Sequence, residues 1–341
     1  MRSVCLPLVI ILLAASPAAA QEVEGPAEPD IEIVEQLDLE LDRTERMTVP
    51  VRIEGRGPYS FIVDTGSERT VISRELAEEL GLDPGRTATV HSMTEVSRIA
   101  TVVIPELEVG RRTVSDIHAP ALERRHLGAE GLLGIDSLQS QRVVLDFVRG
   151  EMTVTPSRRE EGRWPEGTIV VNARSRYGHL MLVDASFDGE RVYVIVDTGA
   201  QVTVANTALR RRLERRRRLG TLHPVEIVSV TGGTIAAEYG VARRITIGGA
   251  GIRNLPVAFA DVNPFRQLDL VDRPAILLGM DALQLFDRVS FDFANRRVRL
   301  LLPDMSRLEG EQRLALISPA VPPEAHRAAG SRSSGSGPSP P

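Results

Sequence analysis

The chain contains one long internal repeat, and this repeat limits the possible folds more than any other feature. The tripeptide Asp-Thr-Gly occurs at residues 64–66 and again at 197–199, each time directly after an apolar run. Before each copy, two short apolar runs flank a turn sequence, which is Gly-Arg-Gly-Pro in the first half and Asp-Gly in the second. Such a pattern is typical of a β-hairpin. The sequence therefore predicts two related, strand-rich halves, each with an aspartate at the end of a buried strand.

The two halves also end alike, which supports a duplication. Leu-Leu-Gly occurs at residues 132–134 and 277–279, and a strand-like run follows each copy, at 143–147 and 289–293. We expect the glycine of each copy to leave room for a neighbouring strand. Helical patterns are scarce and cover mainly residues 73–80 and 208–219. Four further aspartates are expected to be structural, Asp136 and Asp281 as helix caps and Asp146 and Asp292 at strand edges.

Composition changes along the chain predict its divisions. Residues 1–20 have a basic start, an apolar stretch and small residues before Ala20, as in a secretory signal peptide. This predicts an exported protein, periplasmic in a bacterium, with cleavage near Ala20; an uncleaved anchor is the alternative. The other predicted parts are an acidic flexible arm (21–42), an N-terminal lobe (43–157), a charged linker (158–170), a C-terminal lobe (171–304) and a disordered tail rich in Pro, Ser and Gly (305–341).

Several function classes are disfavoured by composition. The net charge of −5 gives no general attraction to nucleic acid. Cys5, the only cysteine, lies in the predicted signal, so a mature chain would contain neither a disulfide nor a thiol nucleophile. The six histidines show no metal-ligand spacing, and the sequence has no phosphate loop, dinucleotide fingerprint or nucleophile elbow. We therefore expect no metal and no organic cofactor.

A run of arginines, residues 210–218, is the strongest charged feature of the sequence. A solvated helix face is the interpretation that we favour, because the run lies where the first half has its own predicted helix. Contact with an anionic membrane through Arg210–Arg218 is the alternative. The predicted export argues against nucleic acid as a partner.

The two repeated aspartates predict chemistry if folding brings them together. Two adjacent carboxylates cannot both ionise cheaply, so they share a proton and can activate a water molecule for attack on an amide. The alternative is that both aspartates are solvated turn residues without a catalytic role. Ser67 is expected to hydrogen-bond the Asp64 carboxylate, whereas Ala200, its counterpart after Asp197, cannot. Because such a bond favours the charged form, Asp64 is expected to be the more acidic partner.

With its two Asp-Thr-Gly and two Leu-Leu-Gly segments in the same order, the chain resembles the retropepsin-like aspartic proteases over residues 47–302, in the fused form that bacteria carry. The resemblance implies an all-β protein of two barrel lobes related by pseudo-two-fold symmetry, with few short helices. It also implies that Asp64 and Asp197 are catalytic. The residues implied to support the two active-site loops are Thr65, Gly66, Ser67, Thr198, Gly199, Ala200, Leu133, Gly134, Leu278 and Gly279.

The same resemblance implies a hairpin flap over the cleft from each half. The second flap fits residues 228–235, with Val230, Thr231, Gly232 and Gly233 around its tip. The first flap corresponds to residues 89–96, which include Val90, His91, Ser92 and Met93. This stretch has no glycine at its tip, so the sequence leaves its shape open.

The function predicted from the sequence is an exported aspartic endopeptidase that acts on extended polypeptides. Since both halves belong to one chain, a monomer is sufficient for the active site. Two alternatives remain, namely a catalytically silent peptide-binding protein on the same fold and an envelope-anchored interaction protein. The acidic arm is either a removable pro-segment or a tether.

Overall fold

The computed structural model describes residues 35–38, 40–41, 47–110, 112–138, 141–157, 163–177 and 179–303. The predicted signal peptide and tail, most of the acidic arm, and residues 158–162 of the predicted linker therefore lie outside the described residues. All the described residues belong to one compact unit. Within them, no helix has the length and apolar character required to cross a bilayer.

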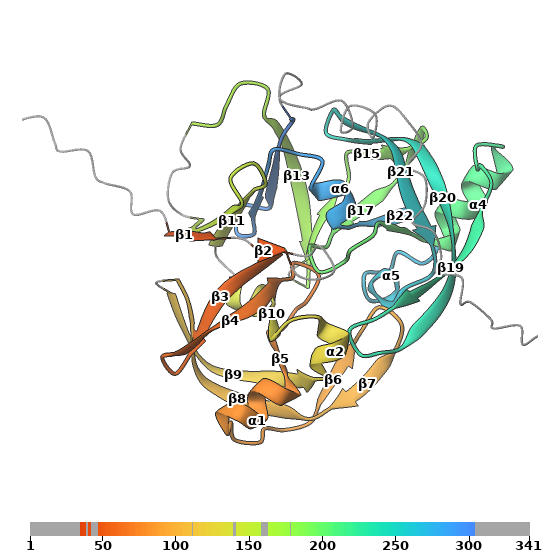
Figure 1. Ribbon diagram of the computed structural model, residues 1–341. Helices are drawn as coiled ribbons and strands as arrows, with labels where there is room; N and C mark the ends of the chain where they lie inside the picture. The colour runs from red at the N-terminus through yellow and green to blue at the C-terminus, as the bar shows by residue number, and fades with distance from the viewer. Residues whose placement is uncertain are drawn as a thin grey trace, which may run out of the picture. The chain divides into compact units, whose positions relative to one another are not determined.

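The N-terminal lobe is a closed six-stranded barrel (Figure 1). Its ring is closed because the last strand, β8, pairs with the first, β3. Large apolar side chains such as Phe61, Ile104 and Leu107 are completely buried in its core. In order around the ring, the strands are β3 (Met47–Ile53), β4 (Arg56–Val63), β10 (Gly131–Leu133), β5 (Val71–Ser73), β9 (Arg112–Leu122) and β8 (Thr101–Val109).

Short helices and two further strand pairs complete this lobe. The predicted helix at 73–80 is present as α1 (Arg74–Leu80), where the Ser73 hydroxyl accepts a hydrogen bond from the Leu76 N–H and caps the first turn. The chain leaves this helix through Gly81 in the left-handed conformation. The remaining elements are β2 (Glu40–Leu41), which pairs with β3, the hairpin β6 (Ala88–His91) and β7 (Val96–Ile99), α2 (Arg124–Leu127) and α3 (Ile135–Leu138).

The C-terminal lobe repeats this plan with an interrupted ring. The counterpart of β3 is split into β14 (His179–Leu182), which pairs with β17, and β15 (Ala185–Phe187), which pairs with β20. Its other strands are β16 (Glu190–Arg191), β17 (Tyr193–Val196), β18 (Val204–Ala205), β19 (His223–Val228), β20 (Thr234–Ile247), β21 (Ala250–Phe259) and β22 (Ala275–Leu278). Its helices are α4 (Thr207–Arg215), α5 (Asn263–Gln267) and α6 (Met280–Leu283).

A run of strands that continues into the sheet of the C-terminal lobe joins the two lobes and reflects their symmetry. At its centre, β11 (Gln141–Asp146) pairs antiparallel with β23 (Arg288–Asp292), and Val144 lies opposite its own repeat equivalent, Ser290. A local two-fold axis therefore passes through this pair. The outer strands are β1 (Glu35–Asp38) and β12 (Glu151–Pro156) on one side, and β24 (Arg297–Leu301) and β13 (Ile169–Arg176) on the other.

Ion pairs across this junction confirm the structural role predicted for two of the aspartates. The Arg288 guanidinium donates to Asp146 at 2.5 and 2.9 Å. By symmetry, the Arg142 guanidinium donates to Asp292 at 3.3 Å. Each pair joins β11 of one lobe to β23 of the other, so the two lobes are held by charge as well as by backbone hydrogen bonds.

Two predicted connecting segments are more ordered than expected. The acidic arm was expected to be flexible throughout, but its described part forms strands β1 and β2. The physical reason is that β12 would otherwise be an exposed sheet edge, which β1 covers. At the other connection, β13 already begins at Ile169, within the predicted linker.

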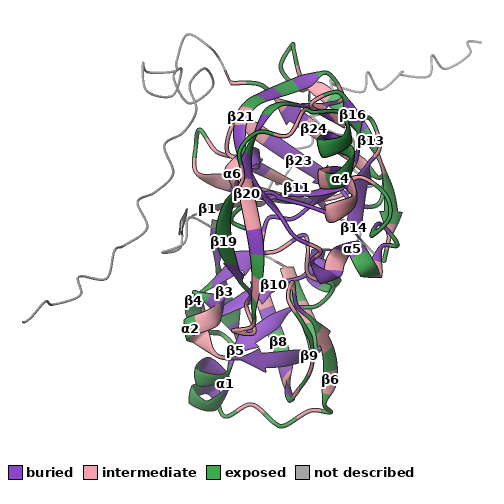
Figure 2. Cartoon of the chain, turned by 90° about the vertical axis from the view of Figure 1, so that its right-hand side faces the viewer, coloured by how far each residue is buried: buried purple, intermediate pink, exposed green. Residues whose placement is uncertain are grey.

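The arginine run is only partly a solvated helix face. It begins in α4, whose outer side is exposed (Figure 2). Three of its members nevertheless converge on the buried carboxylate of Glu190, which is 3% exposed. Their nitrogen-to-oxygen distances are 3.0 Å for Arg212, 2.7 Å for Arg216 and 3.4 Å for Arg218. A buried carboxylate needs such partners, so this part of the run anchors α4 to the β15–β16 hairpin.

Candidate active site

Each Asp-Thr-Gly loop is held by the Leu-Leu-Gly strand of its own lobe. In the first lobe β10 runs parallel to β4, and the Asp64 N–H donates to the Leu133 carbonyl at 3.0 Å. In the second lobe β22 runs parallel to β17, and the Asp197 N–H donates to the Leu278 carbonyl at 3.0 Å. The two motifs predicted to pack together therefore do so, and each aspartate directly follows a buried stretch of strand, residues 61–63 of β4 and 194–196 of β17.

The glycines that follow these strands permit a close approach of backbone, but the neighbour is a loop and not the strand that we predicted. A methyl group on Gly134 would overlap the backbone of Arg69, and one on Gly279 would meet the Val202 carbonyl oxygen at 2.8 Å. Both amides donate to a threonine hydroxyl at 3.2 Å, Gly134 to Thr70 and Gly279 to Thr203. Each glycine thus allows its strand to lie directly against the active-site loop.

Thr65 and Thr198 lock the two loops together across the lobes. The Thr65 N–H donates to the Thr198 hydroxyl at 3.0 Å, and the Thr198 N–H donates to the Thr65 hydroxyl at 3.1 Å. The Thr65 hydroxyl also donates to the Val196 carbonyl at 3.1 Å. The Thr198 hydroxyl donates to the Val63 carbonyl at 2.6 Å. Both threonines are buried, so this reciprocal network fixes the position of one loop against the other without water.

The glycines that follow show how close the two carboxylates lie. A methyl group on Gly66 would overlap the carboxylate of Asp197, and one on Gly199 would overlap the carboxylate of Asp64. Each carboxylate is also held within its own loop, Asp64 by the Gly66 N–H at 2.8 Å and Asp197 by the Gly199 N–H at 2.9 Å. Each side chain therefore lies against the opposite loop, in the arrangement that the repeat predicted.

The surroundings of the two carboxylates differ. Asp197 is buried, whereas Asp64 is partly exposed. Burial, followed by the neighbouring charge of Asp64, raises the pKa of Asp197 well above its ordinary value, although the N–H groups of Gly199 and Ala200 oppose the shift. The direction of this shift favours Asp197 as the protonated member of the pair.

The expected asymmetry has a different cause from the one that we predicted. The Ser67 hydroxyl donates to the Arg69 carbonyl at 2.7 Å instead of to the Asp64 carboxylate. In the second loop it is the backbone N–H of Ala200 that reaches Asp197, at 3.2 Å. The prediction for Ser67 was therefore wrong, because the turn that follows Gly66 offers its hydroxyl a nearer acceptor.

The prediction that Asp136 and Asp281 act as helix caps is only partly right. Each carboxylate accepts one N–H of the first helical turn, from Ser137 at 2.7 Å and from Ala282 at 2.8 Å, but each residue lies inside its helix and has a second role. Asp136 accepts hydrogen bonds from the N–H and the hydroxyl of Thr70, at 3.0 and 2.8 Å. Asp281 does the same for Thr203, at 2.9 and 2.8 Å. Each aspartate thus ties the helix after Leu-Leu-Gly to the active-site loop of its lobe. Burial raises the pKa of Asp281 to about 6.

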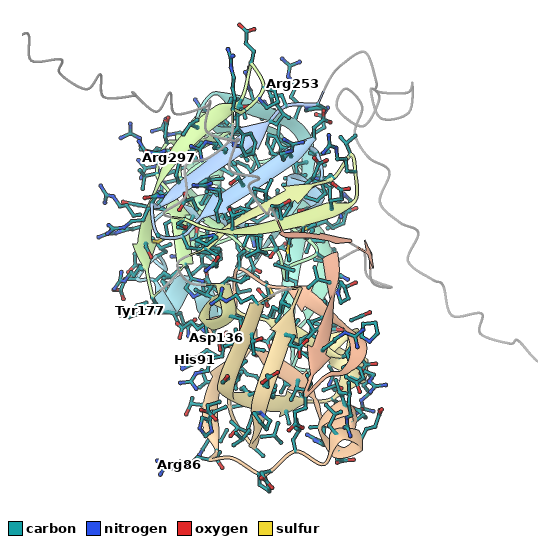
Figure 3. The ribbon with its side chains drawn as sticks, turned by 90° about the vertical axis from the view of Figure 1, so that its left-hand side faces the viewer. Arg86, His91, Asp136, Tyr177, Arg253 and Arg297 are labelled. Atoms are coloured by element: carbon teal, nitrogen blue, oxygen red, sulfur yellow. The ribbon has the colours of Figure 1, made fainter. Side chains whose placement is uncertain are left out.

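Both predicted flaps are hairpins, and the first makes its turn without glycine. In the β6–β7 hairpin, both the main chain and the side chain of Ser92 form hydrogen bonds across the turn to Glu95. Its N–H donates to the Glu95 carbonyl at 2.9 Å, and its hydroxyl accepts from the Glu95 N–H at 3.2 Å. A serine side chain can replace part of a turn in this way. Val90 is half-buried and His91 is exposed (Figure 3).

The tips of the two flaps contact each other. The Thr94 hydroxyl donates to Ser229 at 2.9 Å, and the Thr231 hydroxyl donates to Ser92 at 3.1 Å. Asn263, at the start of α5, holds the first flap through Ser92, to whose carbonyl its amide donates at 2.9 Å.

Each flap also reaches the opposite lobe. Met93 of the first flap packs against the apolar cluster around Ile195 and Leu277 of the C-terminal lobe. Val230 of the second flap packs against Ile62 and Leu132 of the N-terminal lobe. At the tip of the second flap, Gly232 has a φ of +83°, and a methyl group there would overlap the His126 ring of α2. The structure therefore shows the flaps in a closed arrangement.

Sequence reasoning missed His179, which also contacts the site. It begins β14 of the second lobe and approaches Glu68, directly after the first Asp-Thr-Gly-Ser segment. The available signal was a single histidine at the edge of an apolar run. The described residues contain no grouping of three or more His, Cys, Asp and Glu side chains that would suit a metal ion.

A family model described as "Aspartyl protease" matches the chain in two regions, residues 49–137 and residues 183–282. The two matches together cover more than half of the sequence, and each contains one Asp-Thr-Gly loop with its Leu-Leu-Gly strand. A comparison with curated proteins found no match.

Proposed function

The chain belongs to the aspartyl protease family, and from this we propose that it is an endopeptidase in which Asp64 and Asp197 activate one water molecule. The observation that carries the proposal is the packing of each carboxylate against the glycine of the opposite loop. Both carboxylates come from one chain, so a monomer completes the site.

The different surroundings of the pair suggest a role for each carboxylate. Asp64 is the charged partner and removes a proton from the water as its oxygen attacks the peptide carbonyl carbon. Asp197 is the protonated partner and donates its proton to the carbonyl oxygen. Breakdown of the resulting diol cleaves the carbon–nitrogen bond, and the departing nitrogen receives a proton from the pair. No covalent enzyme intermediate forms.

The flaps support an extended polypeptide as the substrate. Both flaps end in a turn whose hydroxyl groups bond to the partner flap. An extended peptide between flap and floor could form backbone hydrogen bonds along its length, and apolar side chains would take the places that Met93 and Val230 occupy. Residues 1–20 further support export as part of this proposal.

The test is digestion of a peptide library by the wild-type chain and by the Asp64→Asn and Asp197→Asn variants, with products identified by mass spectrometry. Asp116→Asn is a matched control, since Asp116 is exposed on β9 and its φ of +55° suits asparagine. The proposal predicts cleavage by wild type and the control, and none by the other two. If wild type binds peptides without cleaving them, the silent binding protein is the better description.

A further inference from the structure

A histidine of the second lobe is buried against the catalytic loop of the first. The side chain of His179 is 8% exposed, and its Nε2 lies 3.8 Å from Glu68 Oε1. Its Nδ1 is buried and has no hydrogen-bond partner. A buried polar atom without a partner is costly, so this residue is poorly explained as a packing element alone.

The groups around His179 connect it to the dyad. The Asp64 charge, the Thr65 backbone and Glu68 all favour its protonated form, but burial outweighs them and lowers the pKa of the imidazole. Arg176, its neighbour in register on β13, is directed away to the Leu268 carbonyl and to Asp269. On its other side, β14 pairs with β17, the strand that leads into Asp197.

Glu68 gives this junction a route to solvent. Its side chain is 52% exposed. It lines a cavity of about 540 Å³ together with Asp136 and Tyr177, both labelled in Figure 3. Glu68 therefore connects the neighbourhood of His179 to solvent through this cavity.

We propose that His179 is a positioning residue of the active site, which supports the Asp64 loop across the lobe junction as a neutral imidazole and is linked to Asp64 through charge. The proposal deepens the proposed function and rests on it for its catalytic meaning. Neutral His179 leaves the single negative charge of the pair undisturbed. Protonated His179 would stabilise anionic Asp64, but it would place a positive charge in a buried position.

The effect of His179 on the pH dependence of stability has a defined sign. Because the pKa of His179 is lower in the folded chain than in the unfolded chain, the stability it contributes is fully present above the unfolded value, about 6.5. That stability is lost as the pH falls towards the folded value. Linkage is reciprocal, so removal of the Asp64 charge must lower the pKa of His179 further.

The test is an NMR titration of the histidine Cε1–H signals in the full chain, for wild type, Asp64→Asn and Glu68→Gln. His179→Gln assigns the signal, and exposed His223 on β19 serves as an internal control. We expect His179 to titrate below an ordinary histidine, and lower again in both variants, while His223 is unchanged. An ordinary pKa for His179, or one that does not respond to Asp64→Asn, would overturn the proposal. Glu68 is exposed, so Glu68→Gln keeps the test valid if His179→Gln does not fold.

Kinetics separate this proposal from the proposed function. His179→Gln should reduce kcat by up to ~100-fold with a smaller change in KM, since loop misplacement affects the chemical step, and should shift the acid limb of the pH profile. An equal loss in kcat at every pH would indicate a structural role and contradict the linkage. If the titrations behave as expected but wild type cleaves nothing, the linkage holds and the proposed function fails.

Discussion

Replacement of Thr198 by valine removes one hydroxyl and almost no volume, which makes it a sharp test of the contact between the loops. The Thr198 hydroxyl donates to the Val63 carbonyl and accepts from the Thr65 N–H, and all three residues are buried. The variant leaves both backbone groups without a partner and in contact with apolar atoms. At about 1–3 kcal/mol for each group, the free energy of unfolding should fall by roughly 2–6 kcal/mol.

Urea denaturation followed by far-ultraviolet circular dichroism measures this loss. Thr113→Val is the matched control, because Thr113 is exposed on β9, and it should change stability by less than about 0.5 kcal/mol. Thr198→Val should also lose activity under conditions where it remains folded, since the carboxylates are no longer held in place. A loss of stability no larger than that of Thr113→Val would show that water or a shift of the loop satisfies the exposed groups, and would refute the reasoning.

Three further predictions concern the loops, the buried aspartate and the flaps. Gly66→Ala should abolish cleavage and cost about 1–3 kcal/mol by overpacking against the opposite carboxylate, whereas Gly220→Ala, with open space around it, should do neither in the same assays. The pKa of Asp281 is raised to about 6, so its contribution to stability is present below about pH 4 and is lost as the pH rises through 6. Asp281→Asn should therefore flatten the dependence of stability on pH in this range. An unchanged slope would contradict the raised pKa of Asp281. Asn263→Ala removes the hydrogen bond to the Ser92 carbonyl, so amide hydrogen exchange in the β6–β7 hairpin should accelerate and KM should rise. Unaltered exchange would show that Asn263 does not hold the flap.

The repeated motifs could be predicted because both occur twice and in the same order, although each Leu-Leu-Gly strand contacts its Asp-Thr-Gly loop across a large sequence separation. Asp-Thr-Gly and Leu-Leu-Gly determine a strand, a turn and a close approach, and duplication requires that both lobes use them alike. The positions of Asp64 and Asp197 followed from this pattern, and the two flap hairpins followed from the family resemblance. The family match over both regions supports the same interpretation.

The failures of prediction arose where a side chain had a choice of partners. Asp136 lies in the first turn of α3 and accepts the Ser137 N–H there, but its carboxylate also bonds to Thr70, which is 66 residues earlier. Ser67 had two acceptors within reach, and the turn geometry decided for Arg69. Such choices depend on the tertiary positions of groups that the local sequence does not specify.

Two other features had no sequence pattern from which they could be predicted. The first is the Ser92 turn, which forms the tip of its hairpin without glycine. His179 appeared only as a histidine beside an apolar run, and its importance depends on Glu68 from the other lobe. The arginine run was conspicuous, but its buried acceptor, Glu190, lies more than 20 residues away from the first arginine that contacts it.

A double-mutant cycle on kcat/KM most directly tests whether Asp64 and Asp197 act as one unit. The rates of peptide cleavage by wild type, Asp64→Asn, Asp197→Asn and the double variant are compared at one pH. If one water and one proton are shared between the lobes, each single replacement should cost about as much activity as the double replacement. Losses that simply add would show that the two carboxylates act independently, and would contradict the account.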